Sequence, residues 1–473
     1  MLSMASTYDL VIVGMGSGGM VAAEFAASLD LRVAAVERGR LGGDCLWTGC
    51  VPSKALIASA RVAHHMRTAD RYGITAVEPQ VDTALVWRRL HAVQDQIAAT
   101  DDNPARFAEM GIELVAGDAR VTGPHTVTAG DRVLDTRFIL LCTGSHSLIP
   151  PVEGLAEAGY LTSETVWDLE RAPQSLVVIG GGPIAIELSQ AFRRLGVPVS
   201  VLQRGPRILP RDEPELVEIL TRVLREEGVE LFLDVDVQRV SARNGTKVVE
   251  GTAAGSPAHW EGAEILVCTG RRPNLDGLGL DEVGVAVGPR GVTVDERLRT
   301  TVPSIYAAGD LAGRYLFTHA AGYEAVRAVR DMFFPGRGRA AALIPWCTFT
   351  EPELAHAGMT VAEARASHGH DAVEIVRHAL PHSDRARADG ATEGGVLLVT
   401  AHGRVVGAHV LAPPAGEMIG ELVLAINQNL KLAELASLIH VYPTYSLGIS
   451  QLAAEAAFES AQRFQWLVRR QRR

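Results

Sequence analysis

A strand, a glycine turn and a helix occur twice in this chain, and this repeat constrains the fold more than any other feature. The first copy places a buried strand at 8–13 and a glycine-rich turn at 14–19, and the second copy places them at 175–179 and 180–185. A helical run follows each turn. This order is typical of dinucleotide binding, so we predict an α/β protein with two Rossmann-like dinucleotide-binding domains.

The first glycine turn contains the residues that a pyrophosphate needs. Gly14 makes the tight bend, Gly16 lets the pyrophosphate approach the backbone, and Gly19 allows close packing of the helix on the strand. The next strand, 32–36, ends in Glu37, where a carboxylate can hold a ribose hydroxyl. Strand, turn, helix and acid together indicate a dinucleotide site.

The second turn has the same pattern, with Gly180, Gly182 and Ala185 in the corresponding places. Its next strand, 199–202, ends in Gln203 and Arg204 instead of an acid, with Arg207 close by. Glutamine removes the repulsion that a carboxylate would exert on a ribose 2′-phosphate, and the two arginines can bind that phosphate. We therefore predict NADPH as the nicotinamide cofactor, with NADH as the alternative, and with these arginines merely facing solvent as the simpler interpretation.

The repeat extends to a strand that closes each half. The segments 139–145 and 265–273 resemble one another and both pass through a Cys-Thr-Gly sequence. Thr143, Gly144 and Gly270 in these segments are candidate cofactor-binding residues. Cys142 and Cys268, at equivalent strand ends, are most simply small buried apolar residues.

Between the two turns, the stretch 42–54 sets Cys45 and Cys50 immediately before a helix start. A regular helix would leave their Cα atoms ~8.6 Å apart, whereas a disulfide needs about 4.4–6.8 Å. The pair must therefore depart from helical geometry, as Gly49 allows, and Pro52 suits the first turn of the helix that follows. This places Cys50 at a helix N-terminus.

The position of Cys50 favours a reactive thiol. Exposed amides and the helix dipole stabilise a thiolate, and Lys54 adds positive charge one turn further on. Three alternatives compete with a redox pair: a structural disulfide, a zinc site, and two unrelated buried thiols. The first lacks a secretion signal and the second lacks two further ligands at suitable spacing. The glycines and proline of the loop argue against the third.

Length and composition limit the remaining possibilities. A chain of 473 residues suggests about three domains. Its net charge of −10 argues against nucleic acid as the main partner, and no apolar run reaches the length of a membrane span. Five cysteines without an export signal indicate a cytoplasmic protein, in which a disulfide is more often catalytic than structural. The basic residues at 469–473 have the composition of a solvated end.

The rest of the chain completes the domain organisation. A short strand near 304 delivers Asp310 beside a glycine turn, where an acid can bind a polyhydroxyl chain. After a flexible connection at Pro335 and Gly336, the last segment has strands, two amphipathic helices and no third glycine turn. We predict a discontinuous FAD-binding domain formed by residues 1–150 and 275–342. Residues 151–274 would form an NAD(P)-binding domain, and residues 343–473 an α+β interface domain.

With two dinucleotide sites and a Cys-x-x-x-x-Cys pair after the first, the whole chain resembles the pyridine nucleotide-disulfide oxidoreductases. This family includes glutathione reductase, dihydrolipoamide dehydrogenase and mercuric reductase, and the stretch 42–54 is the most specific part of the likeness. The resemblance implies an FAD enzyme that is a homodimer, in which a hydride passes from NAD(P)H to the flavin and electrons then pass to the disulfide. It implies FAD binding by Gly14, Gly16, Gly19, Glu37 and Asp310, and nicotinamide cofactor binding by Gly180, Gly182 and Ala185.

The resemblance also implies roles for the residues around the disulfide. Cys50 would contact the flavin and Cys45 would meet the substrate. Lys54 would lie by the flavin ring and pair with Glu187, because an ammonium buried there needs a counter-charge.

The chain departs from this family near its C-terminus. Disulfide reductases carry a histidine before a proline and a glutamate five positions after the histidine, and this dyad reaches the disulfide of the partner subunit. Here Tyr442 and Leu447 stand in those places. A phenol, with a pKa near 10, is a poor base at neutral pH. His440 would lie on the same side as Tyr442 in an extended segment and is a second candidate, or it is hydrogen-bonded within the interface.

The departure leaves several electron acceptors open. A tyrosine at this position resembles the arrangement in mercuric reductase. Two other features of that enzyme, a vicinal cysteine pair at the end of the chain and a metal-binding module before residue 8, are not found in this sequence. We predict no resident metal site. Cys347 is the one other thiol. We predict electron transfer through Cys45 and Cys50 to a small disulfide, a soft metal ion or another electrophile. The alternatives are a quinone or diaphorase-type reductase and a flavin-binding sensor without turnover.

Overall fold

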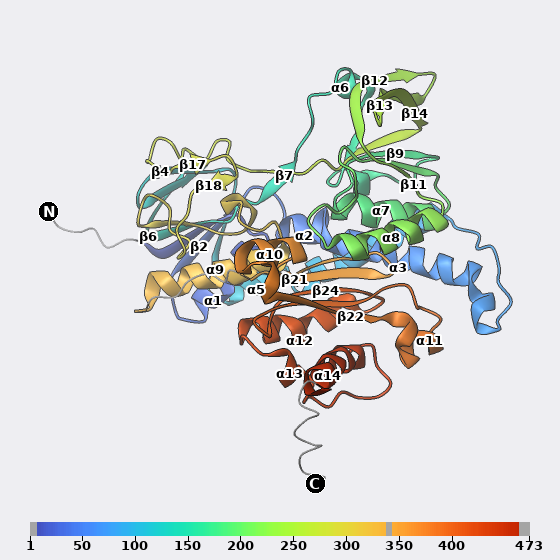
Figure 1. The fold of residues 1–473 in the computed structure, drawn as a ribbon. Coiled ribbons are helices and arrows are strands. Elements are labelled where there is room, and N and C mark those ends of the chain that lie inside the picture. Colours follow the sequence, from blue (N-terminus) through green and yellow to red (C-terminus); the bar gives the residue numbers. More distant parts are fainter. Residues whose placement is uncertain (1–6, 337–342, 463–473) are drawn as a thin grey trace, which may run out of the picture.

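The computed structural model describes residues 7–336 and 343–462, which form three units, each built around its own sheet (Figure 1). The segments 1–6, 337–342 and 463–473 lie outside the described residues. They include the connection expected after Gly336 and the basic C-terminal end.

The first unit is a sheet in the strand order β3-β2-β1-β6-β5-β4, with β19 added to β6. β1 is parallel to both β2 and β6, and its residues are almost all buried, as the apolar run at 8–13 predicts. β19 joins this sheet after the chain has passed through the second unit, so the first unit is discontinuous in sequence. The strands are β1 (Tyr8–Val13), β2 (Val33–Glu37), β3 (Glu113–Ala116), β4 (Ala119–Gly123), β5 (Thr126–Ala129), β6 (Arg132–Leu141) and β19 (Ile305–Ala307).

Two helices far apart in sequence lie side by side against the first sheet. α1 (Ser17–Ala27) follows the first glycine turn, and α9 (Thr318–Phe333) follows β19 (Figure 1). The buried face of α1 consists of alanine and glycine, and half of the buried residues of α9 are alanine, which lets the backbones approach closely. The N-termini of α1 and α9 therefore flank the redox loop.

The second unit repeats this plan with the parallel strand order β11-β10-β9-β15-β8. α7 (Pro183–Arg194) follows the second glycine turn, and α8 (Pro214–Glu226) buries leucine and valine at helical spacing. A three-stranded antiparallel sheet lies at the outer rim (Figure 1). The strands are β8 (Leu161–Thr162), β9 (Leu176–Ile179), β10 (Val199–Leu202), β11 (Glu230–Phe232), β12 (Val235–Arg243), β13 (Thr246–Ala253), β14 (Ser256–Gly262) and β15 (Glu264–Val267).

The third unit is an antiparallel sheet in the order β20-β21-β24-β23-β22. The prediction of two amphipathic helices was incomplete, because the described residues here form five helices, three of them only four to eight residues long. So short a helix shows no clear period in sequence. The elements are β20 (Trp346–Thr348), β21 (Glu353–Gly358), α10 (Val361–His368), β22 (Val373–Ala379), α11 (Asp384–Ala388), β23 (Gly395–Ala401), β24 (Arg404–Ala412), α12 (Ala415–Asn427), α13 (Leu432–Leu435) and α14 (Leu447–Gln462).

Two long helices connect the units. α3 (Cys50–Arg67) packs against α4 (Thr83–Thr100) and against α7 of the second unit. The redox loop is thereby held between the two glycine turns. Within the described residues, no helix is long and apolar enough to cross a membrane.

Candidate active site

The first glycine turn has the shape that a pyrophosphate requires. Gly14 has a φ of +95°, and a Cβ there would lie 2.5 Å from the Cys142 carbonyl oxygen. A Cβ on Gly19 would lie 1.8 Å from the Gly14 carbonyl oxygen, whereas one on Gly16 would meet nothing closer than 3.7 Å. Gly14 and Gly19 are therefore required for packing, and Gly16 leaves open space at the N-terminus of α1.

The second turn repeats this geometry. Gly180 has a φ of +115°, and its Cβ would lie 2.3 Å from the Cys268 carbonyl oxygen, the counterpart of Cys142. A Cβ on Gly182 would meet nothing within 4 Å, and Ala185 is buried against the sheet. Burial raises the thiol pKa of Cys142 and of Cys268 to about 12, as expected for inert packing residues.

Acidic residues lie beside the first turn. The Glu37 carboxylate accepts hydrogen bonds from the Met15 N–H at 2.7 Å and the Gly39 N–H at 2.8 Å, which fixes it at the end of β2. Asp310 begins a short 3-10 helix after β19 and accepts a hydrogen bond from the Ser145 hydroxyl at 2.5 Å. Burial raises the pKa of Asp310.

Sequence reasoning missed an arginine among these acids. Arg271 donates to the Ser145 hydroxyl at 2.7 Å, forms an ion pair with Asp44 of the redox loop, and lies 3.6 Å from Asp310. The residue follows Gly270 in the repeated strand-end segment, and that repeat was the available signal. Arg271 joins the redox loop to the strand that closes the second unit.

The other residues expected from the repeat lie at the same junction. The Thr143 hydroxyl donates to the Asn274 carbonyl oxygen at 2.9 Å, and the Asn274 N–H donates to the Gly144 carbonyl oxygen at 3.0 Å. Gly144 and Gly270 both have positive φ, +70° and +135°. These hydrogen bonds join the end of β6 in the first unit to the segment that returns from the second unit.

The residues after β10 are arranged as an exposed loop. Gln203 donates its side-chain N–H to the Arg207 carbonyl oxygen at 3.1 Å, which shapes the loop. Arg204 is exposed and makes no hydrogen bond or ion pair with any described residue. Arg207 instead donates to the Pro210 carbonyl oxygen at 2.7 Å. Arg204 is therefore the arginine here whose guanidinium is available to a phosphate.

The redox loop interrupts the helix as the spacing of the cysteines predicts. α2 (Gly43–Trp47) ends before Gly49, and α3 begins at Cys50. A Cβ on Gly49 would lie 2.9 Å from the Asp44 carbonyl oxygen, so only glycine fits this bend. Cys45 and Cys50 are free thiols that interact with each other, and Cys50 Sγ lies 3.4 Å from Thr318 Oγ1 at the start of α9.

The two thiols have opposite acidities. A hydrogen bond from Cys45 lowers the pKa of Cys50 to about 6, with help from the Thr318 hydroxyl and the Lys54 ammonium and against the cost of burial. Donating that hydrogen bond raises the pKa of Cys45, and burial raises it further. At neutral pH the pair therefore holds one proton, on Cys45, and one thiolate, on Cys50.

Behind Cys50, Lys54 and Glu187 form the expected ion pair. Lys54 Nζ lies 2.7 Å from the carboxylate of Glu187 and 4.3 Å from the centre of the Phe349 ring. Glu187 also accepts the Phe349 N–H at 2.9 Å. The pair joins α3 to α7 and places a charged group between the two glycine turns.

Tyr442 and His440 face different partners. Tyr442 is 65% exposed, and its hydroxyl donates to Asp384 at 3.2 Å. His440 is largely covered and lies 3.0 Å from the carboxylate of Glu421. The two side chains therefore contact different elements of the third unit, Tyr442 the start of α11 and His440 the middle of α12.

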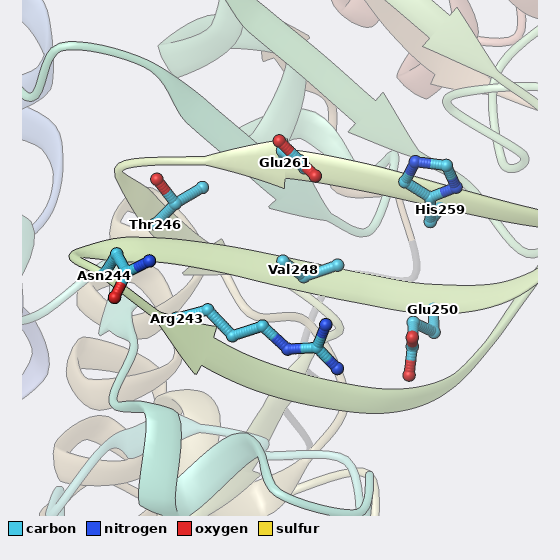
Figure 2. A pocket seen from close by; sticks show the side chains of 7 residues that line it. All are labelled: Arg243, Asn244, Thr246, Val248, Glu250, His259 and Glu261. Carbon is cyan, nitrogen blue, oxygen red and sulfur yellow. The ribbon is translucent and has the colours of Figure 1, made fainter.

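Hollows on the surface of the described residues lie both away from the cysteines and beside them. One lies on the rim sheet β12–β14, where charged and polar side chains stand apart from one another (Figure 2). The other, of about 390 Å³, opens beside Cys45 and is lined by Thr318, His319 and Asp102, which sequence reasoning did not single out. No group of three His, Cys, Asp or Glu residues in the described part of the chain could hold a metal ion.

Comparison with known proteins gives the class that this fold and site define. The model of the pyridine nucleotide-disulphide oxidoreductase family matches residues 8–325, and the model of that family's dimerisation domain matches residues 344–453. The chain therefore belongs to the pyridine nucleotide-disulphide oxidoreductases. It is an oxidoreductase of a family that uses FAD and NAD(P)H, and the open space at Gly16 and Gly182 fits these cofactors.

Individual relatives carry different names. The chain is 34% identical to the dihydrolipoyl dehydrogenase of Thermus scotoductus, covering 96% of this chain and 98% of the relative. It is 35% identical to the mercuric reductase of Streptomyces lividans, covering 96% and 97%. The crystal structure of LpdA from Mycobacterium tuberculosis is similar with a TM-score of 0.86 at 27% identity, covering 95% of this chain and all of that one.

Proposed function

We propose that this enzyme uses NADPH and FAD to reduce a small acceptor through the thiols of Cys45 and Cys50. The observation that carries the proposal is the pair itself. One thiol is acidic and the other protonated, Cys50 begins α3, and Cys45, which lies in α2, borders a pocket. In this proposal FAD binds at the turn before α1 and NADPH at the turn before α7. When bound, FAD accepts a hydride from the nicotinamide and supplies two electrons to the cysteine pair.

The two thiols can supply one of the two protons that reduction of a disulfide requires. Cys45 passes its proton along the hydrogen bond to the Cys50 thiolate, and the Cys45 thiolate then attacks one sulfur of a disulfide acceptor, so that one thiolate leaves. Cys50 gives the proton to that leaving thiolate and attacks Cys45 Sγ. The second thiolate leaves and takes a proton from water. The acceptor gains two electrons and two protons, and Cys45 and Cys50 become a disulfide. This route needs no histidine at position 442.

We infer a homodimer in which the C-terminal stretch completes the site of the partner. The third unit matches a dimerisation domain, and the stretch before α14 exposes apolar side chains, with Ile439 fully exposed and Val441 and Tyr442 largely so. Tyr442 then contributes a hydroxyl and an apolar ring rather than a base. The five free thiols suit a reducing cytoplasm.

The test compares the holoenzyme with its Cys45→Ser and Cys50→Ser variants. Anaerobic NADPH should reduce the wild type by four electrons, with a long-wavelength band between the Cys50 thiolate and the flavin. Both variants should take up two electrons and lose turnover with a disulfide acceptor. Full turnover in either variant would show that electrons leave directly from the flavin, as in a quinone or diaphorase-type reductase. If NADPH does not reduce the wild-type flavin, the result would support a flavin-binding sensor without turnover.

A soft metal ion is a second candidate acceptor, because two adjacent thiols are soft ligands and relatives include mercuric reductases. Mercuric ion should then stimulate NADPH oxidation in the presence of excess thiol and yield elemental mercury. Tight mercuric binding with inhibition of turnover would exclude this acceptor.

A further inference from the structure

The pocket beside Cys45 is built from four separate parts of the first unit. α1, the redox loop with the start of α3, the end of α4 and the start of α9 each contribute side chains. The residues that line it are Ser17, Met20, Val21, Gly42, Cys45, Leu46, Val51, Ile97, Asp102, Thr318, His319 and Gly322. Because Cys45 belongs to this lining, a molecule in the pocket can reach its sulfur.

The surface of the pocket is largely apolar. Met20, Val21, Leu46, Val51 and Ile97 supply half of its side chains, and none of the described residues that line it is a lysine or an arginine. An acceptor with carboxylates would therefore meet no cation among them. It would also lose its hydration against hydrocarbon, which is costly for a charged group.

Asp102 supplies the one carboxylate of the lining. It follows α4, and its carboxylate oxygen lies 2.6 Å from the position that a Cβ on Gly42 would occupy, so the acid packs over the redox loop. Burial raises the pKa of Asp102, and the neighbouring Asp101 raises it further. Arg106 opposes this effect, but it is engaged with Glu24 at 2.6 Å. Asp102 therefore places a carboxyl group beside the pocket.

We propose that this pocket selects uncharged, apolar disulfides and that Asp102 turns anionic disulfides away. The inference rests on the proposed function, because it assumes that the acceptor meets Cys45. It deepens that function by naming the acceptor class. A carboxylate on the acceptor is repelled by Asp102 at short range and is partly shielded from solvent, whereas an uncharged disulfide gains contact with the apolar side chains.

The test uses two aromatic disulfides with the holoenzyme and NADPH. Dithiodipyridine is uncharged at neutral pH, and dithiobis(nitrobenzoate) carries a carboxylate on each ring. Each kcat/KM is divided by the rate constant of the same probe with a free thiol, which removes differences in intrinsic reactivity. The normalised kcat/KM should be at least about tenfold higher for the uncharged probe at low salt. Equal values would overturn the proposal.

Asp102→Asn isolates the charge, and Asp101→Asn is the matched control, because Asp101 is adjacent but does not line the pocket. Asp102→Asn should raise kcat/KM for the anionic probe about fivefold, with a gain of at most about twofold for the uncharged probe. Asp101→Asn should have a smaller effect on the anionic probe. Equal effects of the two variants would overturn the proposal, because general surface charge would then explain the discrimination.

Val21→Lys provides a second, independent variant from another element of the lining, at an exposed position on α1. It should raise kcat/KM for the anionic probe by a factor similar to that of Asp102→Asn. No change in either variant would overturn the proposal. Cys45→Ser distinguishes failure of the proposed function from failure of this proposal. If the variant still reduces both probes, electrons do not pass through Cys45 and the proposed function fails. If it reduces neither, the ratio of the two probes in the wild type tests the selectivity of the pocket.

Discussion

Lys54 Nζ and the carboxylate of Glu187 lie 2.7 Å apart, and this ion pair joins the helix that begins at Cys50 to the helix of the second glycine turn. Glu187 is nearly buried, whereas the Lys54 side chain is about one-third exposed. The pair therefore connects the redox loop to the helix of the second glycine turn in a single contact.

Glu187→Gln removes the counter-charge of Lys54 but preserves the hydrogen bond to the Phe349 N–H. Lys54 then loses the group that fixes its position, so we expect flavin reduction by NADPH to slow about tenfold with little change in protein fold. Stopped-flow absorbance measures the rate. Glu187→Asp, which restores the charge on a shorter side chain, should recover part of it, and an unchanged rate in Glu187→Gln would contradict a role for the pair.

The hydrogen bond from Cys45 is the main cause of the low pKa of Cys50. In a Cys45→Ser holoenzyme, a hydroxyl keeps this donor, and the band between the Cys50 thiolate and the flavin should titrate near the wild-type pKa of about 6. In Cys45→Ala the donor is lost, and the midpoint should move to higher pH. Identical midpoints would assign the low pKa to Thr318 and Lys54 instead.

Arg204 determines our preference for NADPH. Because Arg204 is exposed and makes no hydrogen bond or ion pair with the described residues, Arg204→Gln should raise KM for NADPH about tenfold and leave KM for NADH nearly unchanged. Initial rates at subsaturating cofactor measure both. A wild-type preference for NADH, or an equal loss with both cofactors, would contradict this prediction.

Arg194 connects the second unit to the third through buried charges. It is 5% exposed and pairs with Glu227 at 2.6 Å and with Glu351. Arg194→Met leaves Glu227 without its arginine and leaves Glu351 with its longer contacts to Arg61 and His65 at 3.5 Å, so we expect a loss of about 3 kcal/mol in the free energy of unfolding. The control is Arg222→Gln, which breaks an exposed pair with Glu393 and should cost less than about 1 kcal/mol. Chemical denaturation of the holoenzymes distinguishes them.

His356 and His409 make the fold sensitive to acid. Burial lowers the pKa of His356 to about 3 and that of His409 to about 4. A histidine with a lowered folded-state pKa contributes stability above its unfolded pKa of about 6.5, and this contribution is lost as pH falls toward the folded value. Below about pH 6.5 the unfolding free energy should therefore decrease by up to roughly 1.4 kcal/mol per pH unit for each histidine.

A nearby carboxyl opposes this effect and provides the control. Burial raises the pKa of Asp212 to about 6, so its neutral form favours the folded state at low pH. Asp212 donates nothing when ionised but accepts the Trp346 indole N–H at 2.8 Å. Denaturation between pH 8 and 5 should be steeper with pH in Asp212→Asn and shallower in His409→Gln. A His409→Gln profile equal to that of the wild type would contradict the assignment.

Local sequence patterns predicted the elements that carry chemistry. The strand 8–13 coincides with β1, and the predicted strand 199–202 coincides with β10, because short, mainly apolar segments suit buried parallel strands. The break between Cys45 and Cys50 was predictable because a disulfide and a regular helix have incompatible Cα distances. The helices of the third unit were not fully predictable, because their short length leaves tertiary packing, not periodicity, to define them.

The sequence by itself determined the two glycine turns, the position of Cys50 at a helix start and the family, since each depends on residues within a few positions of one another or on whole-chain likeness. Only the tertiary structure decided what surrounds the cysteines. Asp102 reaches the redox loop from α4, Thr318 reaches Cys50 from α9, and Arg271 reaches Asp44 from the far end of the second unit. Such contacts join residues up to 268 positions apart, and no local pattern encodes a pairing at that separation.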